Sequence, residues 1–192
     1  MNLKESLETI NDSRIDRCKK HSLVDILMIV FFGVLCGYKS IESIHLYAEL
    51  SINVLKKYLI LANGIPSADT ILREITLMLQ KEGFRVAMDD FGSGESSLNM
   101  LSTIPVNILK FDRSFLFAND AKTGKLDETS ETFIETLVDL GKNLKKETIF
   151  EGVETEEQRD FLRKINCDQV QGFFYSKPLR EEEYMEFLKN HR

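Results

Sequence analysis

The sequence has no excess of basic residues. Its 192 residues include 25 lysines and arginines against 31 aspartates and glutamates, which gives a formal net charge of -6 at pH 7. A protein that binds nucleic acid neutralises many phosphates with lysine and arginine. This charge balance therefore argues against a nucleic-acid partner.

Cysteine and histidine are scarce and scattered. The chain has three of each, and none of them forms a CxxC pair or a Cys/His spacing typical of zinc ligands. Three distant cysteines also provide no disulfide framework. We therefore expect reduced thiols, no zinc site and a cytoplasmic location.

Long apolar runs are absent as well. The most hydrophobic stretch, ILMIVFFGVLC at residues 26–36, is shorter than the roughly 20 residues that span a bilayer. We expect it to form a buried helix rather than a membrane span. The first twenty residues are too charged for the apolar segment of a secretory signal, so no export signal is predicted.

Helix signals dominate residues 22–75. Ser22 is predicted to cap a helix that ends near Gly37, and Ser40 to open a second helix. A third apolar segment covers residues 53–61, and Ser67 or Asp69 can cap a fourth helix. Residues 1–75 are therefore predicted to form an all-helical domain.

Three motifs in this front part, KKHSLVDILMIVFFGVLCG, SIESIHLYAE and NGIPSADTILREI, occur in that order over residues 15–75. They resemble the helical domain that precedes the catalytic domain in one family of DDE-type insertion-sequence transposases. The acids that cut DNA in those enzymes lie further along the chain, where this sequence changes character, so the resemblance does not imply their activity. An ordinary helical bundle explains the same apolar residues.

The pattern changes to a short strand at FRVAMDDFGSG, residues 84–94, which contains the adjacent acids Asp89 and Asp90. Two neighbouring carboxylates repel each other, so a fold that holds both needs a cation, a basic partner or solvent. In an unbroken strand their side chains point to opposite faces. Acidic residues that open a Gly-Ser turn are the alternative interpretation.

Four strands are predicted in this second part, beginning at Phe84 and covering residues 107–112, 148–154 and 168–173. Each is followed by a helical pattern, which predicts a parallel sheet with helices outside. In such folds the reactive groups gather at the C-terminal ends of the strands. The side chains expected there are Asp89, Asp90, Lys110, Asp112, Glu151, Glu154 and Gln171.

This set of side chains suits phosphodiester hydrolysis. Carboxylates bind hard cations such as Mg²⁺ or Mn²⁺, a lysine can neutralise charge on a phosphate, and a glutamate can activate water. Asp112 with Arg113 is more typical of an ion pair or a cap, and Glu154 of a cap for the helix near Glu156.

Four motifs, DDFGSGESSLNML, PVNILKFDRSF, EGVETEEQ and CDQVQGFFYSKPL, resemble the C-terminal half of the EAL domain. That domain is the (β/α)8-barrel phosphodiesterase that linearises cyclic di-GMP, and the resemblance covers residues 78–190. It implies that Asp89 and Asp90 ligate Mg²⁺ or Mn²⁺, that Lys110 contacts the reacting phosphate, that Glu151 places the attacking water, and that Gln171 supports the site. It also implies a homodimer formed through the loop Gly92–Leu98.

The sequence departs from the EAL pattern in three ways. Glu95 stands where the family usually has an aromatic residue, and a polar insert occupies residues 118–129. Residues before 76 contain no counterpart of the Glu-Ala-Leu signature or of the asparagine and glutamate ligands that follow it. A half-barrel is also expected to leave two sheet edges and an apolar interior uncovered.

We therefore predict an α/β fold with a helical domain at residues 1–75 and a half (β/α)8 barrel of about four parallel βα units at residues 76–192. The predicted function is that of a truncated, catalytically impaired cyclic di-GMP phosphodiesterase. The alternatives are an active enzyme completed by another chain, a nucleotide- or protein-binding module, and an inactive transposase remnant.

Overall fold

The helices of the front part begin at the predicted cap residues. The computed structural model describes residues 3–10, 12, 14, 19–92, 98–116 and 126–190. Helices α2 (Leu23–Leu35), α3 (Ile41–Leu50) and α5 (Ala68–Lys81) each follow a serine whose hydroxyl accepts a backbone N–H of the first turn. These serines are Ser22, Ser40 and Ser67. Two shorter helices, α1 (Leu3–Glu8) and α4 (Ile52–Leu55), complete this part, so the third predicted helix is limited to α4.

The chain forms two compact units. The first comprises Met1–Phe84 with Met100–Pro105, and the second comprises Arg85–Asn99 with Val106–Arg192. The predicted domain boundary after residue 75 falls inside α5, which continues to Lys81 without interruption. That boundary stays a prediction, and each unit is considered by itself below.

The first unit has its own apolar core, which α2, α3 and α5 build together. Gly33 of α2 allows α3 to lie close, since a Cβ at this position would meet Cγ1 of Ile44 at 2.8 Å. Helix α2 buries Ile26 and Ile29, whereas Leu35 at its end is 68% exposed. The prediction of a buried helix at residues 26–36 therefore holds for the part with Ile26 and Ile29 but not for the end of this run. Among the described helices, none has the length and apolarity needed to cross a bilayer, and a cytoplasmic location stays a prediction.

A buried carboxylate ties α2 to the turn that precedes α5. Asp25 is 5% exposed, and its Oδ2 accepts the N–H of Leu61 at 3.1 Å. Leu61 has a left-handed φ of 42°, a backbone conformation that residues other than glycine seldom adopt. The hydrogen bond to Asp25 helps to hold this residue in place.

Replacing Asp25 with alanine should lower the free energy of unfolding by about 1–3 kcal/mol, because the buried N–H of Leu61 loses its acceptor. Urea unfolding followed by far-ultraviolet circular dichroism measures the change. Asp69→Ala, at an exposed position in the first turn of α5, is the control. An Asp25→Ala protein as stable as Asp69→Ala would contradict this role.

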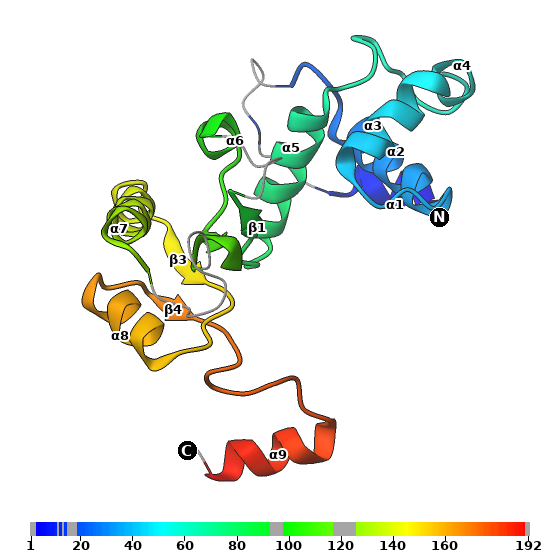
Figure 1. The fold of residues 1–192 in the computed structure, drawn as a ribbon. Helices are drawn as coiled ribbons and strands as arrows, with labels where there is room; N and C mark the ends of the chain where they lie inside the picture. The colour runs from blue at the N-terminus through cyan, green and yellow to red at the C-terminus, as the bar shows by residue number, and fades with distance from the viewer. Residues whose placement is uncertain are drawn as a thin grey trace. The chain divides into compact units, whose positions relative to one another are not determined.

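The second unit is built on a parallel sheet. The sheet contains four strands (Figure 1): β1 (Ala87–Phe91), β2 (Ile108–Phe111), β3 (Glu147–Phe150) and β4 (Gln169–Val170). They are hydrogen-bonded in the order β1-β2-β3-β4, and every neighbouring pair is parallel. Along the chain each strand is followed by a helix: α6 (Leu98–Thr103), α7 (Glu128–Asn143), α8 (Glu156–Lys164) and α9 (Glu181–Asn190). Most of α6 belongs to the first unit, and a 3₁₀ turn covers Arg113–Leu116. The predicted α/β fold with four parallel βα units is confirmed.

One face of the sheet is buried and apolar. Phe91, Phe111 and Phe150 are in register on three adjacent strands and are at most 4% exposed. The rings of Phe111 and Phe150 stack with centroids 4.8 Å apart, and Phe91 meets Phe111 edge to face at 5.8 Å. We call these three residues the phenylalanine ladder. Helix α7 packs closely on β3, because a Cβ at Gly141 would lie 2.4 Å from the Thr148 methyl group.

Candidate active site at the strand ends

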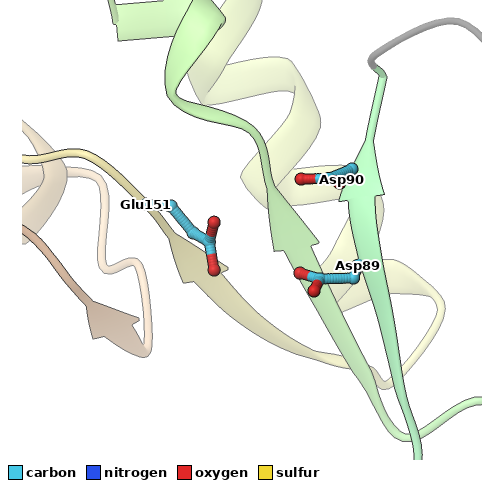
Figure 2. Close-up of side chains that lie close together, drawn as sticks. All are labelled: Asp89, Asp90 and Glu151. Carbon is cyan, nitrogen blue, oxygen red and sulfur yellow. The ribbon is translucent and has the colours of Figure 1, made fainter.

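The end of β1 carries Asp89 and Asp90 side by side on the same side of the sheet. In the register, Met88 pairs with Leu109 and Phe91 with Phe111, so both aspartates oppose Lys110 alone. This is the geometry of a β-bulge, in which an extra residue reorients the side chains that follow. Asp90 has a φ of 49°, which completes the reorientation. Both carboxylates therefore point toward Glu151, which directly follows β3 (Figure 2), instead of pointing to opposite faces.

Lys110 of β2 lies between carboxylates from its two neighbouring strands. Its Nζ donates to Oδ1 of Asp89 at 2.6 Å and forms an ion pair with Oε1 of Glu151. These hydrogen bonds, first that to Asp89 and then that to Glu151, raise the pKa of Lys110 above its usual value of 10.5. At neutral pH this side chain is therefore an ammonium group, which can bind an anion but cannot act as a base.

The carboxylates of Asp89, Asp90 and Glu151 form one cluster. Each offers an oxygen, and these three oxygens lie within 4.8 Å of one another. Hard divalent cations such as Mg²⁺ and Mn²⁺ prefer oxygen ligands of this kind. The residues therefore fit such a cation, although the Lys110 ammonium already pairs with two of them.

Gln171 lies next to this cluster but is not part of it. Its backbone N–H donates to the Phe150 carbonyl at 2.8 Å, and its carbonyl accepts from Val153 at 3.0 Å. These bonds place Gln171 beside Glu151 on the adjoining chain segment, with an exposed side chain. Four of the five predicted site residues, Asp89, Asp90, Lys110 and Glu151, are thus brought together.

Two other strand-end acids have structural contacts. Asp112 accepts the backbone N–H of Ser114 at 2.8 Å, and hydrogen bonds with Ser114 lower the pKa of this carboxyl. The prediction that Asp112 acts as a cap is therefore confirmed. The cap of α8 is Thr155, which forms a capping box with Gln158, so the predicted cap at Glu154 is wrong.

The sheet face that carries the site is not apolar, contrary to expectation. At the start of the strands Glu147 forms an ion pair with Arg85 and accepts a hydrogen bond from Gln169. Ile108 and Ile149 are half-buried between this group and the Lys110 cluster. This second polar group was not predicted from the sequence. Strand alternation could have revealed it, because Glu147 and Ile149 must share a face with Glu151.

Two of the predicted segments lie outside the described residues. Residues 93–97 make up most of the loop predicted to mediate dimerisation, and they include Glu95. Residues 118–125 make up most of the polar insert. Helix α7 begins at Glu128, so the last residues assigned to the insert belong to that helix.

The sequence of this chain matches a known protein family. The EAL domain family matches residues 45–178, and the chain therefore belongs to the EAL domain family. The match begins within α3, inside the segment predicted to be a separate helical domain.

Individual relatives match a part of this chain. The cyclic di-GMP phosphodiesterase NbdA of Pseudomonas aeruginosa is 35% identical over 114 residues, which cover 59% of this chain and 14% of NbdA. The crystal structure of the EAL domain of Mycobacterium smegmatis DcpA has a TM-score of 0.58 at 31% identity, covering 66% of this chain and 55% of that chain. The MucR phosphodiesterase of Pseudomonas aeruginosa, in its cyclic di-GMP complex, has a TM-score of 0.54 at 25% identity, covering 83% of this chain and 70% of that chain. This chain spans 14% to 30% of the length of its curated relatives.

Proposed function

We propose that this chain is a cyclic di-GMP phosphodiesterase-like protein whose catalytic step is impaired. One observation carries the proposal. The cluster of Asp89, Asp90 and Glu151 that fits a divalent cation contains three carboxylates, and the Lys110 ammonium already pairs with two of them. Relatives such as NbdA, which is named a cyclic di-GMP phosphodiesterase, support the substrate.

The residues of the cluster can each serve part of the reaction. Asp89 and Asp90 would hold Mg²⁺ or Mn²⁺, and Glu151 would orient the attacking water. Such a cation supplies Lewis acidity and a more acidic bound water when present. The Lys110 ammonium would neutralise negative charge that develops on the phosphate. Gln171, exposed beside Glu151, would hydrogen-bond to the same group.

The impairment follows from the small number of ligands. Mg²⁺ favours about six oxygen ligands in near-ideal octahedral geometry, and Ca²⁺ is bound by about six to eight oxygen ligands. Residues 1–75 contain no counterpart of the Glu-Ala-Leu signature or of the further ligands expected with it. A cation held by three carboxylates, two of them shared with an ammonium group, should bind weakly and be a poor catalyst.

Hydrolysis of cyclic di-GMP in the presence of Mn²⁺ tests this function. We expect turnover at least about 100-fold slower than that of an intact EAL enzyme assayed in parallel, because removal of one electrostatic group at a reacting centre already costs that much. Asp89→Asn should remove the remaining turnover, whereas Asp139→Asn, at an exposed position on α7, should not change it. Turnover equal to that of the intact enzyme would refute the impairment. Equal turnover in wild type and Asp89→Asn would refute the assigned site.

A binding module without turnover is the second candidate. The raised pKa of Lys110 keeps a positive charge at the strand ends, where it can pair with a phosphate diester. Calorimetry with cyclic di-GMP distinguishes this candidate from a protein that neither binds nor hydrolyses the dinucleotide.

Completion of the site by another chain, including a homodimer through the loop Gly92–Leu98, would instead make the turnover per chain rise with protein concentration.

The two-part organisation is also our proposal. Residues 1–75 would correspond to the transposase-associated helical domain, and residues 76–192 to the half-barrel. The helices α2, α3 and α5, with the order and spacing of their motifs, support this division. The continuity of α5 through residue 75 favours a later boundary for the packed units. The EAL match from residue 45 instead favours an earlier start for the EAL-related part.

A further inference from the structure

A polar cavity of about 470 Å³ lies entirely within the first unit, at the start of α5. Its walls include the side chains of Arg14, Lys20, His21, Ser67, Thr70 and Arg73. Among the described residues, none that lines it carries a carboxylate. Three permanently cationic side chains around one cavity are unusual in a chain whose net charge is -6.

Arg14 is a buried and fixed positive charge. Its side chain is 10% exposed, and Asp12 accepts two hydrogen bonds from it, from Nε at 2.8 Å and from Nη2 at 2.7 Å. Nη2 also donates to the His21 carbonyl at 3.0 Å. A guanidinium group held in this way needs no further ordering when an anion binds nearby.

Arg73 contributes a hydrogen-bond donor that lacks an acceptor. Its Nη2 donates to Oε1 of Glu74 at 2.7 Å, but its Nε is buried and makes no hydrogen bond with the described residues. Buried N–H groups are almost always paired with an acceptor. Because Arg73 forms part of the cavity wall, an anion within the cavity could supply the missing acceptor.

The residues that line the cavity carry its positive charge. Asp25 acts on His21 without lining the cavity. Arg14, Lys20 and Arg73 carry three positive charges, and Asp12 and Glu74 pair with Arg14 and Arg73. Those two carboxylates line a separate cavity of the same unit. Burial and, secondly, the charge of Lys20 lower the pKa of His21, whose ring also hydrogen-bonds with the Gly64 backbone. Its imidazole therefore stays neutral at pH 7 and adds no positive charge to the cavity.

The start of α5 adds hydroxyl groups and a favourable dipole. Ser67 Oγ and Thr70 Oγ1 lie 2.9 Å apart at the first turn of this 14-residue helix. A helix N-terminus carries a partial positive charge that favours anions. The cavity therefore combines guanidinium, ammonium and hydroxyl donors around one space.

We propose that this cavity binds the phosphate group of a small phosphomonoester. A phosphate accepts hydrogen bonds on several oxygens, which matches the number and variety of donors, and arginine pairs well with it. The volume lies within the range of small-molecule sites and exceeds what a single inorganic phosphate fills. The site is independent of the strand-end cluster, since none of its residues belongs to the second unit.

Calorimetry on the complete chain tests the proposal, with EDTA present to remove cations. Inorganic phosphate and adenosine 5′-monophosphate are the probes. We expect saturable binding of one molecule per chain, with the monophosphate bound more tightly than phosphate. Arg73→Gln should weaken binding by about tenfold or more, because a charge-assisted hydrogen bond is lost. Lys57→Gln, at an exposed position of the same unit, should leave binding unchanged.

A second pair of variants guards against a folding defect. Arg73→Lys keeps the charge but removes the Nε donor, so it should bind with intermediate affinity, and Lys20→Gln should bind several-fold more weakly. Binding that persists unchanged in Arg73→Gln and Lys20→Gln would overturn the proposal. Sulfate or chloride bound as tightly as phosphate, or a monophosphate bound no more tightly than phosphate, would also overturn it.

Discussion

Replacing Phe111 with alanine should destabilise the second unit by about 3–5 kcal/mol, the usual cost of removing a buried phenylalanine side chain. Phe111 is fully buried and is the central member of the phenylalanine ladder. Its loss would remove the stacking partner of Phe150 and the edge-to-face partner of Phe91 together. The cavity would open on β2, in the middle of the three strands, where neighbouring side chains have little freedom to fill it.

The loss of stability in Phe111→Ala should also disturb the candidate site. Each ladder residue adjoins a site residue in the chain: Phe91 follows Asp90, Phe111 follows Lys110, and Phe150 precedes Glu151. Hydrogen exchange on segments 106–112 and 147–151 measures the loss of stability in these strands separately from the helical unit. Phe133→Ala, at a position 50% exposed on α7, should change exchange in these segments far less. Equal effects of the two variants would show that the ladder does not hold the sheet together.

The predictable parts of the fold are those encoded by local chemistry. Serine hydroxyls that accept first-turn N–H groups marked the starts of α2 and α3, and Ser67 rather than Asp69 caps α5. Apolar runs that end on charged residues marked the four strands and the order of the βα units. Because all four strands are parallel, their ends meet at one edge, which brought Asp89, Lys110 and Glu151 together as predicted.

The parts that could not be predicted depend on pairing between distant segments. The bulge at Asp89 and Asp90 exists only relative to the register of β2, and no local signal distinguishes it from an ordinary strand end. The partners of Glu147 lie on two other segments, at Arg85 and Gln169. These contacts make the uncovered face of the sheet polar, so the expectation of an apolar interior failed there.

The end of a family motif is likewise not a structural boundary. The predicted helical domain stops at Ile75, but backbone hydrogen bonding in α5 continues to Lys81 because nothing between these residues breaks a helix. The chain contains no proline between Pro66 and Pro105, and Gly83 is the first glycine after α5. Local helix signals alone would therefore have placed the end of this element at Gly83.

Replacing Lys110 with methionine should tighten Mn²⁺ binding by about tenfold or more. The ammonium group lies 2.6 Å from Oδ1 of Asp89 and pairs with Glu151, so it competes with a divalent cation for the same oxygens. Removing one positive charge about 4 Å from a divalent cation gains roughly 2 kcal/mol even at the dielectric constant of water, and tenfold corresponds to about 1.4 kcal/mol. Methionine keeps most of the length of the side chain without its charge.

Mn²⁺ titration followed by electron paramagnetic resonance measures this affinity directly and does not depend on turnover. Lys164→Met, at an exposed position on α8, controls for the change in net charge. Lys110→Met should also abolish hydrolysis of cyclic di-GMP, because the phosphate loses its cationic partner. Cation affinity should therefore rise in this variant while turnover falls. Weaker Mn²⁺ binding in Lys110→Met would instead show that the ammonium group holds the three carboxylates together, and that without it their mutual repulsion disperses the cluster.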